Sequence, residues 1–108
     1  MEIIFHAHHA TISDSMRRRA EAGARRAGRR AGRAVDAVIR FEQDGPVKRV
    51  EIVLHASSRR DIVARGESRF YGLALTAALD RLNAQIRTVR GSAKTAKRAG
   101  PTRLAAQA

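Results

Sequence analysis

The chain has 108 residues, of which 22 are Lys or Arg and 10 are Asp or Glu, so its formal net charge is +12. This length fits a single domain. Disulfides and cysteine-based zinc sites are excluded because there is no cysteine. The sequence starts without the features of a secretory signal, and no apolar run approaches the roughly 18 residues that span a bilayer. We therefore expect a soluble, cytoplasmic protein. Repulsion among so many like charges destabilises a small fold unless an anionic partner neutralises them, so we also expect the partner to be a polyanion.

The first expected elements are a strand and a long helix. Residues 2–7 are expected to form a strand, with Ile3, Phe5 and Ala7 on one face and Ile4, His6 and His8 on the other. Ser13 or Asp14 can accept hydrogen bonds from the free N–H groups of a helix that spans about residues 14–31. The inward stripe of this helix is almost entirely alanine.

Arginine dominates the rest of this helix. Eight arginines fall between residues 17 and 33, and a single glutamate, Glu21, accompanies them. Acidic and basic residues normally mix on a solvated helix surface. This one-sided charge predicts a surface that binds a polyanion, for which nucleic acid is the leading candidate.

Three more strands and a second helix complete the expected fold. Alternation places the strands over residues 34–43, 47–56 and 61–66. A helix over about 69–91 has the strongest apolar stripe of the chain. The residues expected to point inward from the first of these strands are Val35, Ala37, Ile39 and Phe41.

This order predicts an α+β fold, a two-layer sandwich β-α-β-β-β-α in which a four-stranded sheet carries both helices on one face. A sheet with one buried and one exposed face is usually antiparallel. Residues 91–108 are basic and rich in small residues, which predicts a disordered tail. The expected organisation is therefore a folded domain over residues 1–90 and a basic tail over 91–108.

The sequence gives little support to metal binding or catalysis. The histidines His6, His8 and His9 lie close together, but no local carboxylate besides Glu2 would complete a metal site, so we expect no metal. No arrangement of Ser, His and Asp suggests catalysis, so we expect no enzyme activity and no cofactor. A His-dependent metal enzyme remains the least favoured hypothesis. Most of the aromatic residues are expected in the core, and Phe70 is the best candidate for stacking on a base.

Element order, spacing and charge together resemble a known family, the short ribosome hibernation-promoting factors and the related ribosome-associated inhibitor A proteins, which are ribosomal subunit interface proteins. The resemblance covers about residues 1–90. It is carried by two stretches, Ile3-x-Phe5 with Ala7-His8-His9 and Thr11-Ile12-Ser13-Asp14-Ser15-Met16-Arg17, and Ile62-Val63-Ala64-Arg65-Gly66-Glu67 with Tyr71, Leu75, Leu79-Asp80-Arg81-Leu82 and Gln85-Ile86.

The resemblance implies a non-enzymatic hibernation factor. Such a protein binds the rRNA of the small ribosomal subunit, alone or within a 70S ribosome, in the decoding channel for tRNA and mRNA, and represses translation under stress or in stationary phase. It implies neither a membrane partner nor a small-molecule substrate. The alternative is a general RNA-binding module, because the α-β-β-β-α order after the first strand is similar to that of double-stranded-RNA-binding domains.

Matching positions one by one, Arg26, Arg29 and Arg81 fall where the family places basic rRNA-contacting residues, and Arg17 falls where basic residues are common. Neighbouring arginines can compensate for uncharged residues at other such positions. The complete set of expected rRNA-binding residues is Arg17, Arg25, Arg26, Arg29, Arg30, Arg81, Arg87 and Arg90.

Overall fold

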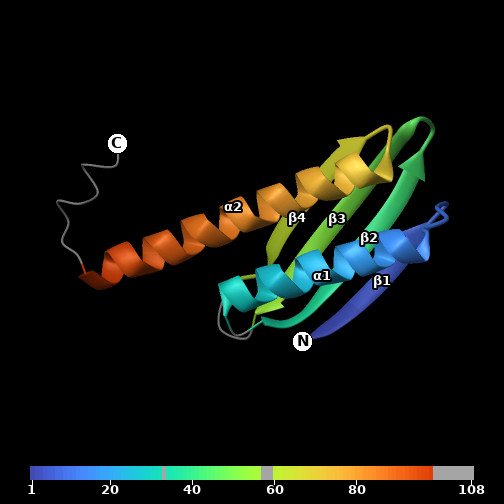
Figure 1. The fold of residues 1–108 in the computed structure, drawn as a ribbon. Coiled ribbons are helices and arrows are strands. Elements are labelled where there is room, and N and C mark those ends of the chain that lie inside the picture. Colours follow the sequence, from blue (N-terminus) through green and yellow to red (C-terminus); the bar gives the residue numbers. More distant parts are fainter. Residues whose placement is uncertain (33, 57–59, 99–108) are drawn as a thin grey trace.

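The computed structural model describes residues 1–32, 34–56 and 60–98, those from 90 onward as helix backbone only. Its elements are β1 (Glu2–His8), α1 (Asp14–Ala31), β2 (Ala34–Asp44), β3 (Val47–Ala56), β4 (Ile62–Ser68) and α2 (Tyr71–Arg98). They form one four-stranded sheet in the order β1-β2-β3-β4, with α1 and α2 side by side on one face (Figure 1). The expected two-layer α+β fold is confirmed.

The sheet is mixed, whereas the alternation of buried and exposed residues pointed to an antiparallel sheet. β1 pairs with β2 in parallel, while the β2–β3 and β3–β4 pairs are antiparallel. The cause is the connection between the first two strands. α1 carries the chain back across the sheet before β2 begins, and a helical crossover of this kind joins parallel strands.

The two layers fill the core differently. The sheet supplies large, fully buried side chains from β2 and β3, namely Ile39, Phe41, Val50, Ile52 and Leu54. The buried residues of α1 are all small: Ala20, Gly23, Ala24, Ala27, Gly28 and Ala31. A Cβ added at Gly23 would lie 2.7 Å from Leu79 Cδ1 of α2. The small residues of α1 therefore let it pack closely against α2, while the sheet and α2 provide the bulk of the apolar core.

The start of β2 and the end of α2 differ most from expectation. Val35 is 53 % exposed instead of buried, because a register shift between Ala34 and Asp36 interrupts the ladder at the start of β2. α2 continues to Arg98, past its expected end near residue 91. Gly91 alone does not end the helix, since a single glycine costs only about 1 kcal/mol and good helix formers follow it. The rest of the predicted tail, residues 99–108, lies outside the described residues.

The Tyr71 hydroxyl gives a first testable prediction. The Tyr71 ring meets Phe41 edge-on, with ring centroids 5.7 Å apart, and its hydroxyl is buried without a hydrogen-bond partner among the described residues. Burial raises the pKa of Tyr71 above its ordinary value, which further favours the neutral phenol. We expect Tyr71→Phe to keep the free energy of unfolding or raise it by up to about 1 kcal/mol, because it removes an unsatisfied buried group. Urea unfolding of both proteins measures the difference, and a clear loss of stability would contradict it.

Candidate nucleic-acid interface

α1 presents most of its arginines to solvent because of how the helix begins and packs. The Ser13 side chain, one of the two caps that the sequence allowed, accepts a hydrogen bond from the Met16 N–H at 3.1 Å. The buried alanines and glycines then face the sheet at three- and four-residue steps. The remaining positions hold arginines on the two flanks and the outer side of the helix.

One flank of α1 faces α2. Arg19 donates hydrogen bonds to the Gly72 carbonyl, at 3.2 Å, and to the Thr76 hydroxyl. Arg30 donates to Asn83 Oδ1 at 3.0 Å. Arg26 lies between them on the same flank, because positions 19, 26 and 30 differ by seven and four residues, close to whole helical turns. Three arginines of α1 thus line its boundary with α2.

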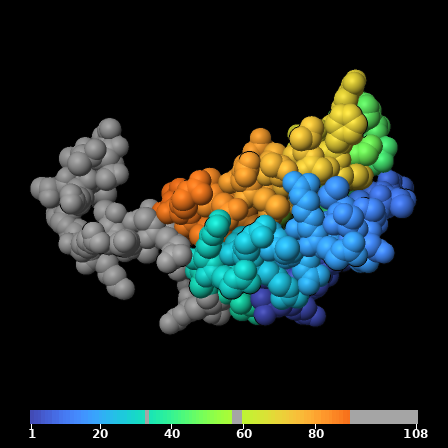
Figure 2. All heavy atoms as spheres, viewed as in Figure 1, coloured from blue at the N-terminus to red at the C-terminus, as the bar shows by residue number. Residues whose placement is uncertain are grey.

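Further arginines extend this surface. Arg18 and Arg29 are exposed on the outer side of α1, and Arg29 also lines a hollow with Arg25 and Met1 toward β1. On α2, Arg87 is exposed one turn beyond Asn83, which Arg30 contacts. We call this set the outer arginine surface: Arg18, Arg19, Arg26, Arg29, Arg30 and Arg87. Figure 2 looks onto the face of the molecule that α1 and α2 cover.

The opposite flank of α1 faces β1. The Arg17 guanidinium lies over the Phe5 ring, 5.0 Å from its centroid. Arg25 pairs with Glu21 at 3.0 Å and donates a hydrogen bond to the Met1 carbonyl at 2.9 Å. These two arginines are therefore directed toward the edge of the sheet and are partly occupied by contacts within the protein.

Arg81 lies on the far side of α2 from α1. Its guanidinium donates a hydrogen bond to the Arg65 carbonyl of β4, and Gln85, one turn later, donates to the Val63 carbonyl at 2.6 Å. Both side chains thus satisfy carbonyl groups of β4 with donors from α2. Unpaired carbonyls on an edge strand invite pairing with another chain, so these contacts protect the edge.

The structure therefore divides the predicted rRNA-binding residues. Arg26, Arg30 and Arg87 belong to the outer arginine surface, and Arg29 lies at its edge, toward Arg25. Arg17 and Arg25 lie toward β1, Arg81 lies toward β4, and the side chain of Arg90 is outside the described residues. Arg18 and Arg19 join the surface although the sequence did not single them out. For Arg19 a signal existed, namely its helical spacing from Arg26 and Arg30.

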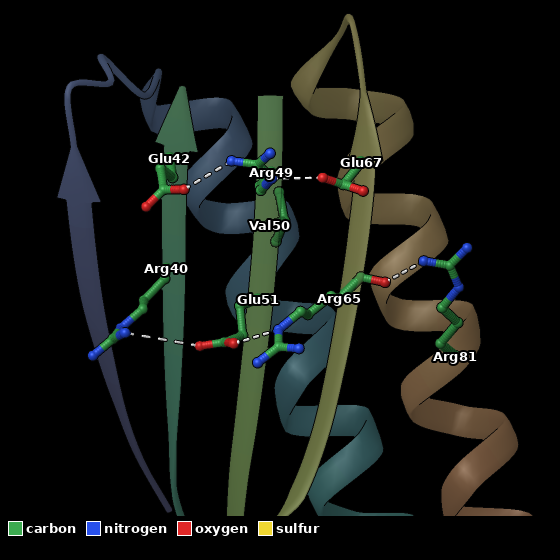
Figure 3. A pocket seen from close by; sticks show the side chains of 8 residues that line it. All are labelled: Arg40, Glu42, Arg49, Val50, Glu51, Arg65, Glu67 and Arg81. Carbon is green, nitrogen blue, oxygen red and sulfur yellow. Dashed lines mark hydrogen bonds and ion pairs between the residues drawn. The ribbon is translucent and has the colours of Figure 1, made fainter. Parts of the chain in front are cut away.

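The open face of the sheet carries charges that neutralise one another. Arg49 bonds three carboxylates, those of Glu67, Asp44 and Glu42, and these hydrogen bonds raise its pKa. Figure 3 shows how this network and a second one, in which Arg40 and Arg65 flank Glu51, line a cavity of about 400 Å³ with Arg81 at its edge. Because these guanidinium groups already face carboxylates, they offer little to a polyanion.

The charge of the fold is consequently segregated. α1 holds seven arginines against two acidic residues, Asp14 and Glu21. On the sheet, by contrast, the three arginines that form ion pairs and His55 lie against six carboxylates, those of Asp36, Glu42, Asp44, Glu51, Asp61 and Glu67. The helical face is therefore the side of the molecule that attracts an anionic partner.

The described residues hold neither a metal-binding cluster nor a membrane-spanning helix. Within them, no group of three or more His, Cys, Asp or Glu side chains is placed to hold a metal ion. In the same part of the chain, neither helix is long and apolar enough to cross a membrane. His8 and His9, which the sequence placed near a conceivable metal site, contact each other ring to ring with centroids 4.2 Å apart.

Comparison with known proteins identifies the family. No curated protein sequence matches the chain. A ribosomal subunit interface protein from Coxiella burnetii has the same fold, with a TM-score of 0.76 and 19 % identity over 84 % of this chain and 99 % of that one. The N-terminal domain of Protein Y from Thermus thermophilus is also similar, with a TM-score of 0.68 and 23 % identity over 82 % and 99 %. The family model described as Sigma 54 modulation protein / S30EA ribosomal protein matches residues 3–94. The chain belongs to this family.

Proposed function

We propose that this protein is a ribosome hibernation factor that binds the small ribosomal subunit and represses translation. The outer arginine surface contacts the backbone phosphates of rRNA in the channel that tRNA and mRNA otherwise occupy. The protein acts by occlusion and performs no reaction, and its place of action is the cytoplasm, where ribosomes work. The membership of the chain in the S30EA ribosomal protein family supports the ribosome as its partner.

The observation that carries this proposal is the grouping of six arginines along α1 and α2, on the side of the molecule away from the acidic network of the sheet. A planar guanidinium can give two parallel hydrogen bonds to a phosphate, which suits a surface that must bind a folded RNA backbone. Phosphate contacts carry little sequence information, so the shape of the channel selects the site. The name of the Coxiella burnetii relative, a ribosomal subunit interface protein, supports the same location.

Sedimentation of a cell extract tests the proposal. The protein should co-migrate with small subunits or whole ribosomes and should inhibit translation when added to a cell-free system. A general RNA-binding module would instead bind duplex RNA and ribosomes with similar affinity. Protein that stays at the top of the gradient while ribosomes are intact would contradict the hibernation assignment, and equal affinity for duplex RNA would favour the general module.

The salt dependence of binding is a second prediction. Each phosphate contact contributes a slope of about −0.7 to −0.9 to a plot of log affinity against log salt concentration. If four to six of the surface arginines bind phosphates, the slope lies between about −3 and −5, and affinity falls by about a hundredfold to a thousandfold between about 50 and 200 mM salt. Titration of fluorescently labelled protein with small subunits measures the slope. A flat response would rule out a phosphate-binding surface.

A further inference from the structure

Phe70 is an aromatic residue that the core does not use. The rings of Phe5, Phe41 and Tyr71 form a continuous series of contacts, with centroids 6.4 and 5.7 Å apart. Phe70, immediately before α2, takes no part in these contacts and is 65 % exposed, and Leu73, one turn later, is 61 % exposed. Among the described residues these are the two most exposed large apolar side chains.

The charged residues next to this apolar pair are mainly basic, and Glu67, three residues before Phe70, is paired with Arg49. Arg69 precedes Phe70 and is exposed, and the Arg19 guanidinium is held at the same turn of α2 by the Gly72 carbonyl. The first turn of α2 contains no acidic residue. The nearest acidic residue along the outer side of the helix is Asp80, which follows Leu73 by seven residues, about two turns. The segment that joins β4 to α2 lies at one end of the face that the helices cover (Figure 2).

We propose that Phe70, supported by Leu73, stacks on an unpaired base of the RNA that the outer arginine surface binds. This inference rests on the proposed function and adds to its phosphate contacts a stacking contact with a base. An exposed ring can stack on any base through its face, and RNA loops offer such bases where they are splayed out of a helix. Leu73 extends the apolar area against which the base lies.

The charge around Phe70 favours RNA as the occupant over a protein. Arg69 is the chain neighbour of Phe70, and Arg19 is held at the same end of α2 by the Gly72 carbonyl, so guanidinium groups are available there for the phosphates of a nucleotide whose base lies on Phe70. Pairing of an aromatic platform with basic residues is the arrangement that single-stranded nucleic acid requires. The site therefore continues the outer arginine surface onto the start of α2.

Two substitutions at Phe70 distinguish the possible partners. Phe70→Leu keeps the apolar volume but removes the aromatic face, so affinity for small ribosomal subunits should fall by roughly tenfold to a hundredfold, the usual effect of losing one stacked base. The slope against salt should not change, because no charge is altered. Phe70→Trp should retain affinity, and since the chain contains no tryptophan, its indole is a unique fluorophore whose emission a stacked base quenches.

Val35→Ala serves as the matched control, because Val35 is 53 % exposed on β2 and removal of its side chain should leave affinity unchanged. Wild-type affinity of Phe70→Leu would overturn the stacking contact. Phe70→Trp emission that shifts to shorter wavelength without quenching would show that the ring enters a protein pocket instead. If the wild-type protein fails to bind ribosomes at all, the proposed function fails first, and that outcome is visible before any variant is made.

Discussion

Reversing the charge of Arg26, Arg29 and Arg87 together is expected to abolish ribosome binding. All three side chains are exposed on the outer arginine surface. Losing three phosphate contacts removes about 2 to 3 from the slope against log salt, which corresponds to a loss of about a hundredfold to five-hundredfold in affinity near 0.1 M salt. Repulsion between the new glutamates and phosphates adds to this loss. Co-sedimentation with small subunits and cell-free translation measure the effect.

The fold should survive these changes. Arg25 and Arg29, like Arg26 and Arg30, are like-charged pairs four residues apart in α1, and each such pair destabilises a helix by a few tenths of a kcal/mol. Arg29→Glu and Arg26→Glu turn both pairs into attractive ones. These gains offset part of the cost of placing a glutamate at position 29, in the last turn of α1, where the helix dipole favours a basic residue. Circular dichroism and thermal unfolding should therefore show a folded helix, which separates loss of binding from loss of structure.

Two double substitutions to glutamine test whether the surface or the total charge matters. Arg26→Gln with Arg29→Gln, and Arg40→Gln with Arg65→Gln, each lower the net charge by two. Arg40 and Arg65 lie on the open face of the sheet, where their side chains are 63 % and 72 % exposed and flank Glu51. Only the first variant should lose affinity strongly. Equal losses would mean that the ribosome responds to net charge and that the helical face has no special part.

Much of the fold could be predicted from the sequence because its signals are local. The alternation in β3, where Val50, Ile52 and Leu54 are fully buried, and the apolar stripe of α2 both follow from the period of one element. The direction of β1 relative to β2 depends on how α1 crosses the sheet, and no periodicity encodes that. The end of α2 was missed because Gly91 is a weak signal that the helix-forming residues after it outweigh.

The site was less predictable, and α1 shows why. Its alanine stripe has arginines on both sides, so the sequence alone does not say which flank meets α2 and which meets β1. On α2, Arg81 and Arg87 are six residues apart, about 240° around the helix, and therefore point to different sides. The expected set of rRNA-binding residues contains both arginines. The packing of α2 separates them, because Arg81 faces β4 and donates a hydrogen bond to the Arg65 carbonyl. Contact of Arg81 with rRNA stays a prediction. The hydrogen bond of Arg81 to β4 gives this residue a structural role as well.

Gly66→Ala is expected to be the most disruptive single-methyl change in the domain. A Cβ at this position would lie 2.1 Å from the carbonyl oxygen of Ala74 and 2.6 Å from the backbone nitrogen of Ala78, both in α2. Backbone atoms of a helix cannot rotate away as a side chain can, so α2 must move off β4 and uncover its apolar stripe. We expect a loss of at least about 3 kcal/mol in the free energy of unfolding, measured by urea denaturation.

Gly72→Ala is the matched control, because it adds the same methyl group to α2 itself. The nearest atom would be Arg19 Nη1 at 3.5 Å, an ordinary contact, and alanine favours the helix by up to about 1 kcal/mol over glycine. Stability should therefore stay the same or rise. If Gly66→Ala is tolerated as well as Gly72→Ala, α2 does not rest directly on β4. α2 holds Arg87 beside α1, so a shift of α2 also moves part of the outer arginine surface. Any Gly66→Ala protein that remains folded should therefore bind ribosomes less tightly than the Gly72→Ala protein. The packing of this one glycine thus affects the geometry of the binding surface.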